Sequence, residues 1–527
     1  MQQAMTASER VAQEDLVLFI NACFACTGQS EFYGPREDQS VSIRFLHEYI
    51  LGNYRRLYAR TLAAGVNHFN QALIIQNLLL AGAPADRTQR TEEGELILAA
   101  LLSLPPQRAY HLFRDLRRLR CNNRRTRGVF AAYLARRPDL NFDAVKYRAH
   151  VRAVAAHAHL RLPEEVGSFL FVGPRQKSSY RTPLFESFRR AFYAAEAVYD
   201  LPYTIALGLS RKHRIPPDVF LSRIAGQMTT GEKLRLLQTA DRQDVPEIDI
   251  DLARAPLTKL CLYLLARPLE ERRSRAAEFA AALRGSAQRA VQQGGRSAAS
   301  TRLGRVVAIL DRSYSASGSD EKRRRPLAVA LATSQILRTV AREYRAIWTP
   351  GLRAALASSD GAIPRTDDAL DASLLGAEYE LLVQAQGQTA LAEPLLTALA
   401  LQPDLIVVVS DGFENDPPAA CDAIVRAFRQ HIDRKRAVSI VHANPVFDSD
   451  RFMPRALGPS IATIGLRDAE DLLTMLGFAR FADGSAPLSE LEQYLAERVP
   501  QLLRRLAART ERDGSSQAAG PHGEVRR

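Results

Sequence analysis

Oxygen-bearing side chains in separate loops of this sequence follow runs of apolar residues. Asp311, Ser313 and Ser315 stand directly after the apolar run 306–310, and Asp411 follows a second such run. Short continuous apolar runs are typical of buried strands in a parallel sheet. Open α/β sheets bind their ligands at the carboxyl ends of the strands. The sequence therefore predicts an α/β sheet with a binding site at that edge.

A fifth residue, Thr389 in another loop, completes a set made only of carboxylates and hydroxyls. Such oxygen ligands suit a hard cation, because nitrogen and sulfur ligands are absent from the set. We therefore expect Mg²⁺, or another divalent cation, at Asp311, Ser313, Ser315, Thr389 and Asp411. Two carboxylates leave the ion incompletely neutralised, so a carboxylate of an acidic protein partner is the natural further ligand.

The order Asp-x-Ser-x-Ser, loop Thr, strand-end Asp resembles the metal-ion-dependent adhesion site of von Willebrand factor A domains. The resemblance implies that Asp311, Ser313 and Ser315 hold the metal from the first loop. Thr389 and Asp411 would approach it directly or through water. It also implies a doubly wound α/β domain in which the metal binds a partner and does not catalyse.

Residues 304–506 alternate helices and strands in the way that such a domain requires. Helices are expected at 326–340, at 390–401 with Thr389 as N-cap, at 421–432 and at 469–478, and further strands at 344–348, 437–441 and 460–466. Alternation of this kind predicts a parallel sheet covered by helices on both faces.

The first 283 residues predict helices throughout, because apolar residues recur at helical spacing between short Gly-, Pro- or Asn-containing connections. We expect an α-solenoid of helix pairs at 1–283. A polar linker follows at 284–303, then the α/β domain at 304–506, and a disordered tail at 507–527.

Charge is divided unevenly between the two parts. Residues 1–303 contain 44 Lys+Arg and 29 Asp+Glu, a net charge of +15, whereas residues 304–527 contain 27 and 29, a net charge of −2. An asymmetry of this size indicates a polyanionic partner for the basic part.

Two loops of the basic part concentrate arginine and are candidate RNA-binding sites. Arg prefers planar, bidentate contact with phosphate and stacks on bases. The first cluster is Arg114, Arg117, Arg118, Arg120, Arg124, Arg125 and Arg127, and the second is Arg175, Lys177 and Arg181 beside a possible stacking residue, Tyr180. A third, smaller candidate lies at 211–214. The alternative for each is a solvated charged face.

A basic helical region followed by an A domain resembles the Ro autoantigen family with its TROVE module, and the segment 220–229 is similar to part of that module. The resemblance implies a ring of helical repeats closed by the A domain. It also implies binding of small noncoding RNA or RNA ends. On this basis we expect a non-catalytic ribonucleoprotein scaffold of Ro type.

A second hypothesis is a metal-dependent adaptor that works with a MoxR-type AAA+ ATPase, as many bacterial A-domain proteins do. An enzyme is not expected, since the sequence contains no Walker A motif, no nucleophile elbow and no dense carboxylate cluster. No apolar run reaches membrane length and no secretory signal is evident, so we expect a cytoplasmic protein without membrane contact.

The remaining reactive residues are expected to be structural. Cys23 and Cys26 form a single Cys-x-x-Cys pair, which is more typical of buried thiols than of a zinc site. His150, His157 and His159 share one predicted helix without an acidic partner, so we expect surface or packing roles. Residues 317–325 are expected to form an exposed loop.

Overall fold

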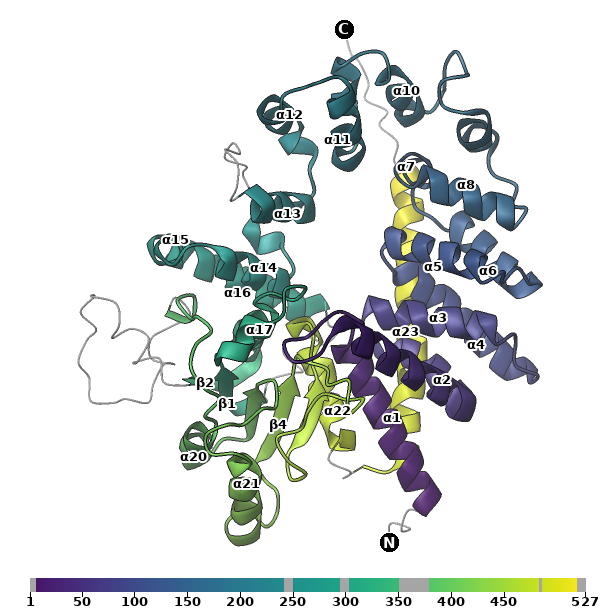
Figure 1. Cartoon of the computed structure of the whole chain (residues 1–527). Coiled ribbons are helices and arrows are strands. Elements are labelled where there is room, and N and C mark those ends of the chain that lie inside the picture. Colours follow the sequence, from purple (N-terminus) through teal and green to yellow (C-terminus); the bar gives the residue numbers. More distant parts are fainter. Residues whose placement is uncertain (1–5, 241–249, 294–302, 350–378, 483–485, 519–527) are drawn as a thin grey trace. The chain divides into compact units, whose positions relative to one another are not determined.

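The computed structural model describes residues 6–240, 250–293, 303–349, 379–482 and 486–518 (Figure 1). Contacts between residues divide the chain into two compact units. The sheet unit comprises Met1–Leu46, Leu234–Gln238 and Ile250–Leu491; the helical unit comprises His47–Lys233, Thr239–Asp249 and Glu492–Arg527. This grouping joins the N-terminal residues to the sheet, so the domain bounds drawn from the sequence stay a prediction.

The sheet unit contains five parallel strands in the order β2-β1-β3-β4-β5. They are β1 (Leu303–Asp311), β2 (Ala341–Thr349), β3 (Leu405–Val409), β4 (Ser439–Asn444) and β5 (Ala462–Gly465). From β1 the chain continues to β2 on one side, and β3 lies on the other, so the strand order reverses between β1 and β3. Open α/β sheets bind ligands at such a switch point.

Helices cover both faces of this sheet (Figure 1). Alternate β1 residues Val307 and Ile309 pack in a core with helices α20 (Ala392–Ala400) and α21 (Ala420–His431). Helix α17 (Arg325–Val340) packs on β1 and β2 and is itself covered by α14 (Leu257–Ala266) and α16 (Ala276–Gln293). Its burial on almost every side explains why its sequence lacks a polar face.

The N-terminal helix α1 (Ala7–Ala25) packs against the edge strand β5 and helix α22 (Leu472–Ala482). The Asn21 side chain donates to the carbonyl of Thr463 (3.1 Å) and accepts from the amide of Gly465 (3.1 Å). It thereby satisfies backbone groups that an edge strand would otherwise leave unpaired. A Cβ on Gly465 would lie 2.3 Å from the Asn21 carbonyl oxygen, so this approach requires glycine.

The structure confirms a mostly helical chain with a five-stranded parallel sheet in its C-terminal part. The predicted helices 326–340 and 421–432 match α17 and α21 within one residue. The helix predicted at 390–401 begins at Ala392 with Leu391 as its N-cap, so the N-cap role predicted for Thr389 is wrong.

Parts of the predicted linker and tail are helical. Residues 284–293 continue α16, and α23 (Leu488–Ala518) extends into the predicted tail. The rest of the linker up to residue 302, and residues 519–527, lie outside the described residues. Ala-, Gln- and Arg-rich composition supports a helix as readily as a polar linker, which explains this difference.

In its described part the helical unit consists of helices joined by short connections. They are α2 (Arg36–Arg60, which begins in the sheet unit), α3 (His68–Leu80), α4 (Arg87–Ser103), α5 (Pro106–Arg118), α6 (Arg124–Ala135), α7 (Leu140–Lys146), α8 (Arg148–His157), α9 (Glu164–Gly167), α10 (Pro183–Arg190), α11 (Tyr203–Lys212), α12 (Pro217–Ile224), α13 (Thr230–Ala240, of which 234–238 belong to the sheet unit) and α23 from Glu492 onward. The helix predicted to contain His150, His157 and His159 is α8, which is separated from α7 at Tyr147 and ends at His157.

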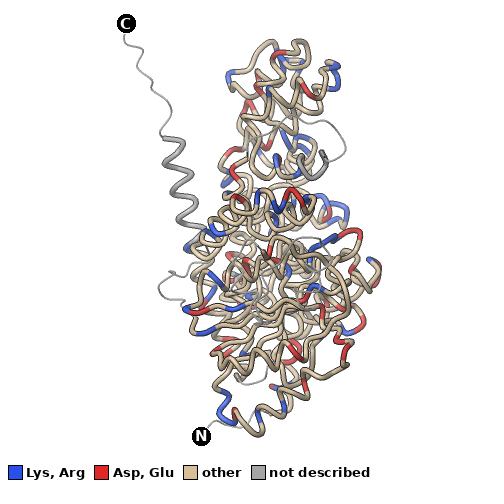
Figure 2. The backbone as a smooth tube through the Cα atoms, turned by 90° about the vertical axis from the view of Figure 1, so that its left-hand side faces the viewer, with Lys and Arg blue, Asp and Glu red and all other residues tan. Residues whose placement is uncertain are grey.

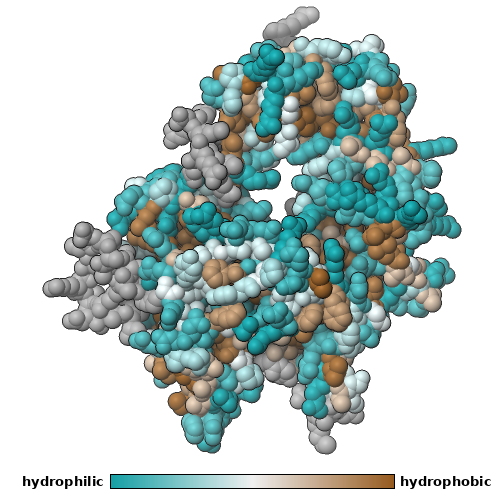
Figure 3. Space-filling model, in the orientation of Figure 1, coloured by the Kyte–Doolittle hydropathy of each residue, from teal (hydrophilic) through white to brown (hydrophobic). Residues whose placement is uncertain are grey.

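The visible surface is mixed in polarity. On the face drawn in Figure 3, apolar residues form separate patches among polar ones. Within the described residues, no helix combines the length and the apolar composition needed to cross a membrane.

A buried histidine of the helical unit predicts acid sensitivity. The Nδ1 of His47 lies 2.8 Å from the Tyr58 hydroxyl, and its Nε2 lies 3.0 Å from Oδ1 of Asn70. Burial lowers the pKa of His47 to about 4, although the hydrogen bond to Asn70 opposes this. The unfolded histidine has a pKa near 6.5. Between these values only the unfolded chain binds the proton, so stability falls as pH falls from about 6.5 to 4.

We expect His47 to contribute about 3 kcal/mol to the free energy of unfolding. This contribution is present above pH 6.5 and is lost by about pH 4. Urea unfolding followed by circular dichroism at 222 nm, at pH 7 and pH 4.5, measures the loss. His47→Gln should show a smaller loss than the natural chain over the same interval. Equal losses in both proteins would contradict the assignment to His47.

Candidate metal centre and nucleic-acid interface

Strands β1 and β3 carry two carboxylates to the same edge of the sheet. β1 ends at Asp311, and β3 ends two residues before Asp411. The strands are parallel neighbours in which Leu310 pairs with Val409. Both carboxylates are buried, with Asp311 4% and Asp411 5% exposed. Residues distant in sequence thus meet at the switch point of the sheet.

Hydrogen bonds hold Asp311 within its own loop. Its Oδ1 accepts from the Ser313 amide (2.8 Å) and the Thr349 hydroxyl (3.3 Å), and its Oδ2 accepts from the Ser313 hydroxyl (2.9 Å). The hydroxyl oxygens of Ser313 and Ser315 lie 3.2 Å apart. One carboxylate and two hydroxyls of the predicted set therefore form one cluster.

Backbone hydrogen bonds join the three loops that carry the predicted metal ligands. The amide of Gln386 donates to the Arg312 carbonyl (2.7 Å), and the amide of Tyr314 donates to the Gly387 carbonyl (2.9 Å). The carbonyl of Thr389 accepts from the amide of Asn415 in the third loop (3.1 Å). Thr389 is 1% exposed. These bonds bring Thr389 into the same loop cluster, while its role at a metal stays a prediction.

The electrostatics of the cluster favour an added positive charge. Burial raises the pKa of Asp311 to about 7, and the neighbouring charge of Asp411 acts in the same direction. Burial also raises the pKa of Asp411, against the opposing effects of a hydrogen bond from Ser315 and the charge of Arg455. A cation between the two carboxylates would offset both the burial and their mutual repulsion.

The donor set fits a hard divalent cation such as Mg²⁺. The Oδ1 of Asp411 accepts from the Phe413 amide (3.1 Å), whereas its buried Oδ2 has no hydrogen-bond partner among the described residues. A space of about 10 Å³ adjoins Asp311 and Asp411, close to what one water molecule needs. Gly412, with φ +80°, turns the chain directly after Asp411, and a Cβ there would lie 2.4 Å from the Arg455 carbonyl oxygen.

A loop from the N-terminus, residues 26–35, packs against the segment that follows the first metal loop. The Ser319 hydroxyl donates to the Ser30 carbonyl (2.7 Å), and the Ser30 amide donates to Glu321 (2.8 Å). Glu31 and Lys322 form an ion pair with both side chains 4% exposed. The prediction that 317–325 is simply an exposed loop is therefore wrong for Lys322.

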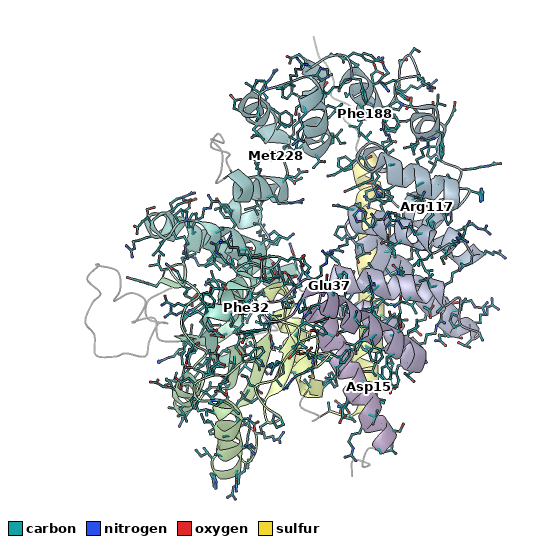
Figure 4. The ribbon with its side chains drawn as sticks, in the orientation of Figure 1. Asp15, Phe32, Glu37, Arg117, Phe188 and Met228 are labelled. Carbon is teal, nitrogen blue, oxygen red and sulfur yellow. The ribbon has the colours of Figure 1, made fainter. Side chains whose placement is uncertain are left out.

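This N-terminal loop places aromatic side chains beside the cluster (Figure 4 labels Phe32). The ring of Tyr33 lies 4.4 Å from that of Phe413, and the ring of Phe32 lies 6.0 Å from that of Tyr314. Burial, with the charges of Asp411 and Asp311, raises the pKa of Tyr33, and a hydrogen bond with Ser315 opposes this. Aromatic rings thus lie next to the carboxylates.

Sequence reasoning missed two side chains of this site. Thr349 ends the strand beside β1, and its position directly after the predicted strand 344–348 was the available signal. Tyr33 comes from a segment almost three hundred residues before the first metal loop. No local pattern links it to the site.

The first basic cluster surrounds the turn between α5 and α6, and Figure 4 labels Arg117. Arg117, Arg118, Arg120 and Arg124 are exposed, and Arg114, Arg125 and Arg127 are partly buried. Arg118 lies 3.9 Å from Asp115, whereas no ion pair to Arg117 or Arg124 occurs among the described residues. Elsewhere Lys and Arg positions are interspersed with Asp and Glu along the chain (Figure 2).

Arg125 occupies a structural position within this cluster. Its guanidinium pairs with the buried Glu93 (2.6 Å) and donates to the carbonyls of Leu78 (3.2 Å) and Gly82 (3.0 Å). Glu93 also pairs with Arg55 (3.0 Å). Loss of Arg125 would therefore disturb the fold, which makes it unsuitable for testing RNA contact.

In the second cluster Arg175, Lys177 and Arg181 are exposed. Tyr180 is 6% exposed, its ring packs 5.6 Å from Phe169, and its hydroxyl donates to the Gly173 carbonyl. The suggestion that Tyr180 offers a stacking surface for a base is therefore wrong. In the smaller cluster at 211–214, Lys212 donates to the Phe192 carbonyl (2.7 Å).

The cysteines are all buried and none forms a disulfide: Cys23, Cys26, Cys121, Cys261 and Cys421. The described residues contain no group of three or more His, Cys, Asp and Glu side chains placed to hold a metal. A site of two carboxylates with hydroxyls is a different type from such a group.

Comparisons with known proteins add little information about these sites. No family model matches the sequence. No curated protein matches it either. A crystal structure of the RO (RSR) protein of Deinococcus radiodurans is similar at 16% sequence identity with a TM-score of 0.45, over 92% of this chain and 95% of that chain. A likeness this distant assigns neither a family nor a function.

Proposed function

We propose that this chain is an RNA-binding scaffold protein that does not itself catalyse a reaction. Its helical unit would bind the phosphates of a small noncoding RNA or of RNA ends. Its sheet unit would hold Mg²⁺ at Asp311, Ser313, Ser315, Thr389 and Asp411 and so recruit a partner. Both sites consist of side chains of this chain. The α5–α6 turn would form the RNA site.

The observation that carries the RNA proposal is a group of arginines at a helix N-terminus, of which, among the described residues, Arg125 alone pairs with an acidic side chain, Glu93. Arg124, Arg125 and Arg127 lie in the first turn of α6, which contains no acidic residue. The helix dipole favours negative charge at this position, so cations there are unfavourable in isolation. Backbone amides and arginines together make the same place suitable for a phosphate. The exposed Arg117 and Arg118 at the end of α5 extend this surface.

RNA binding by the triple variant Arg117→Gln/Arg118→Gln/Arg124→Gln tests the proposal. Fluorescence anisotropy of a labelled single-stranded RNA should show binding by the natural chain that weakens steeply as salt rises. The triple variant should bind at least about tenfold more weakly, and its salt dependence should fall by about 2 logarithmic units per decade of salt, because three phosphate contacts are lost.

The matched control is Arg87→Gln/Arg136→Gln/Arg161→Gln, which removes the same charge from three exposed arginines outside the predicted clusters. It should keep the affinity and most of the salt dependence of the natural chain. Equal weakening by both triple variants would show a general effect of charge and would overturn the assignment to the α5–α6 turn.

A second candidate function is a metal-dependent adaptor for an acidic protein partner, such as a MoxR-type AAA+ ATPase. The unpartnered Oδ2 of Asp411, next to Asp311 and the aromatic side chains of Phe413 and Tyr33, favours it. This function requires that the sheet unit hold Mg²⁺, which thermal unfolding of Asp411→Asn tests.

A further inference from the structure

A pocket of about 140 Å³ lies between helices α5 and α8 of the helical unit. One of its lining residues, Arg117, also belongs to the exposed surface at the α5–α6 turn. Tyr110 and Phe113 of α5 and Phe130 of α6, each at most 1% exposed, line its apolar part together with Ala149 and Ala153 of α8. The rings of Phe113 and Phe130 lie 4.2 Å apart. A cavity of about 150 Å³ accommodates a benzene-sized molecule, so this pocket has room for one planar ring.

Two arginines of α5, Arg114 and Arg117, line the same pocket. They are three residues apart and therefore lie on one face of the helix. The Nε of Arg114 donates to Asp115 (3.0 Å), which leaves its other N–H groups for a ligand. Arg117 is exposed and forms no ion pair within the described part of the chain. Planar guanidinium groups arranged in this way suit a phosphate.

Two histidines of α8, His150 and His157, complete the polar side of the pocket. The Nε2 of His157 is buried and has no hydrogen-bond partner among the described residues. Burial and the charges of Arg114 and Arg117 lower the pKa of His150. An imidazole nitrogen donates or accepts a hydrogen bond according to its tautomer, which suits the polar edge of a heterocycle.

An apolar slot for one ring, two arginines and an unpartnered imidazole nitrogen together match the parts of a nucleotide. We propose that this pocket binds a single nucleotide, with the base in the slot between α5 and α8 and the phosphate at Arg114 and Arg117. The nucleotide is either free or an unpaired nucleotide of an RNA strand. The strand-bound form rests on the proposed RNA-binding function, whereas the free form does not.

Two ligands and four variants of the whole chain distinguish binding of a free nucleotide from binding of a nucleotide in an RNA strand. Isothermal titration calorimetry measures binding of uridine 5′-monophosphate and of a ten-nucleotide oligouridylate, since a pyrimidine is a single ring. Ala153→Phe fills the pocket from α8 without changing charge, and Ala156→Phe adds the same ring at an exposed position of that helix. Arg117→Gln removes a phosphate ligand, and Arg136→Gln removes an exposed arginine that does not line the pocket.

We expect Ala153→Phe and Arg117→Gln each to weaken binding by about tenfold or more, because they remove the base slot and a charge-assisted contact respectively. Ala156→Phe and Arg136→Gln should bind like the natural chain. Circular dichroism shows whether Ala153→Phe is folded. If it is not, binding of the monophosphate by Arg117→Gln and by Arg136→Gln decides, because Arg117 also belongs to the proposed RNA surface.

Weakening of both ligands by Ala153→Phe supports a nucleotide pocket used by RNA. Weakening of the oligouridylate alone supports the strand-bound source. Binding of the monophosphate with no RNA binding supports the free source and contradicts the proposed function, yet leaves the pocket intact. If RNA binds and Ala153→Phe changes neither affinity, the pocket proposal is overturned while the proposed function stands. If neither ligand binds, the pocket proposal is overturned.

Discussion

Lys322→Met should lower the free energy of unfolding of the sheet unit by about 3–5 kcal/mol, because it leaves Glu31 buried without its cation. Both side chains are 4% exposed, so water cannot replace the lost partner. The chain's one tryptophan, Trp348, lies in β2 and is 2% exposed. Its fluorescence during urea unfolding therefore reports on the sheet unit.

Two further variants separate the buried charge from other effects. Glu31→Leu/Lys322→Met replaces the pair by apolar side chains and should recover most of the lost stability, since neither charge remains buried. Arg36→Met breaks the pair with Glu321, whose side chains are 66% and 34% exposed, and should cost less than about 1 kcal/mol. A loss for Lys322→Met as small as that for Arg36→Met would contradict burial of the pair.

Mg²⁺ should raise the unfolding temperature of the sheet unit by about 5–10 °C when its concentration is near 100 times the dissociation constant. The ion would bind the folded site and relieve repulsion between the buried carboxylates of Asp311 and Asp411. Thermal unfolding followed by Trp348 fluorescence, with Mg²⁺ or with EDTA, measures this shift.

Asp411→Asn should lose the shift, because the variant removes one of two anionic ligands while keeping the side-chain shape. In EDTA it should be at least as stable as the natural chain, since one buried carboxylate is gone. Asp450→Asn, at an exposed position, removes the same charge and should keep the full shift. An equal Mg²⁺ effect in both variants, or none in the natural chain, would count against a metal at these loops.

The sheet and its loop residues could be predicted because local patterns carry them. Continuous apolar runs predicted β1 and β3, and the residues that follow each run predicted where Asp311 and Asp411 would emerge. Their meeting follows from parallel topology, since all parallel strands end at one edge. The metal itself, and the role of each ligand, stay predictions.

Side-chain hydrogen bonds explain why one strand begins later than the sequence predicted. The sequence predicted a strand at 437–441, but β4 spans Ser439–Asn444. The carboxylate of Asp433 accepts from the amides of Ala437 (2.7 Å) and Val438 (3.1 Å). These amides are therefore unavailable to the sheet, and β-propensity alone does not reveal that competition.

Contacts between residues distant in sequence explain the other features that the sequence did not predict. The pair Glu31–Lys322 joins segments 291 residues apart, and the two polar partners have no common pattern. His150 and His157 were expected to be surface or packing residues, because their helix lacks acidic neighbours. Only the packing of α8 against α5 places them in a pocket with Arg114 and Arg117.

The position of α1 has a consequence for how the protein is made. Asn21 bonds to Thr463, 442 residues later in the chain, so a ribosome must add those residues before this helix can meet its strand. Until then the apolar side of α1, including Leu16 and Phe19, lacks its native cover. Helix α1 is therefore placed long after it is synthesised, and a fragment starting at residue 304 would leave the edge of β5 open to other chains.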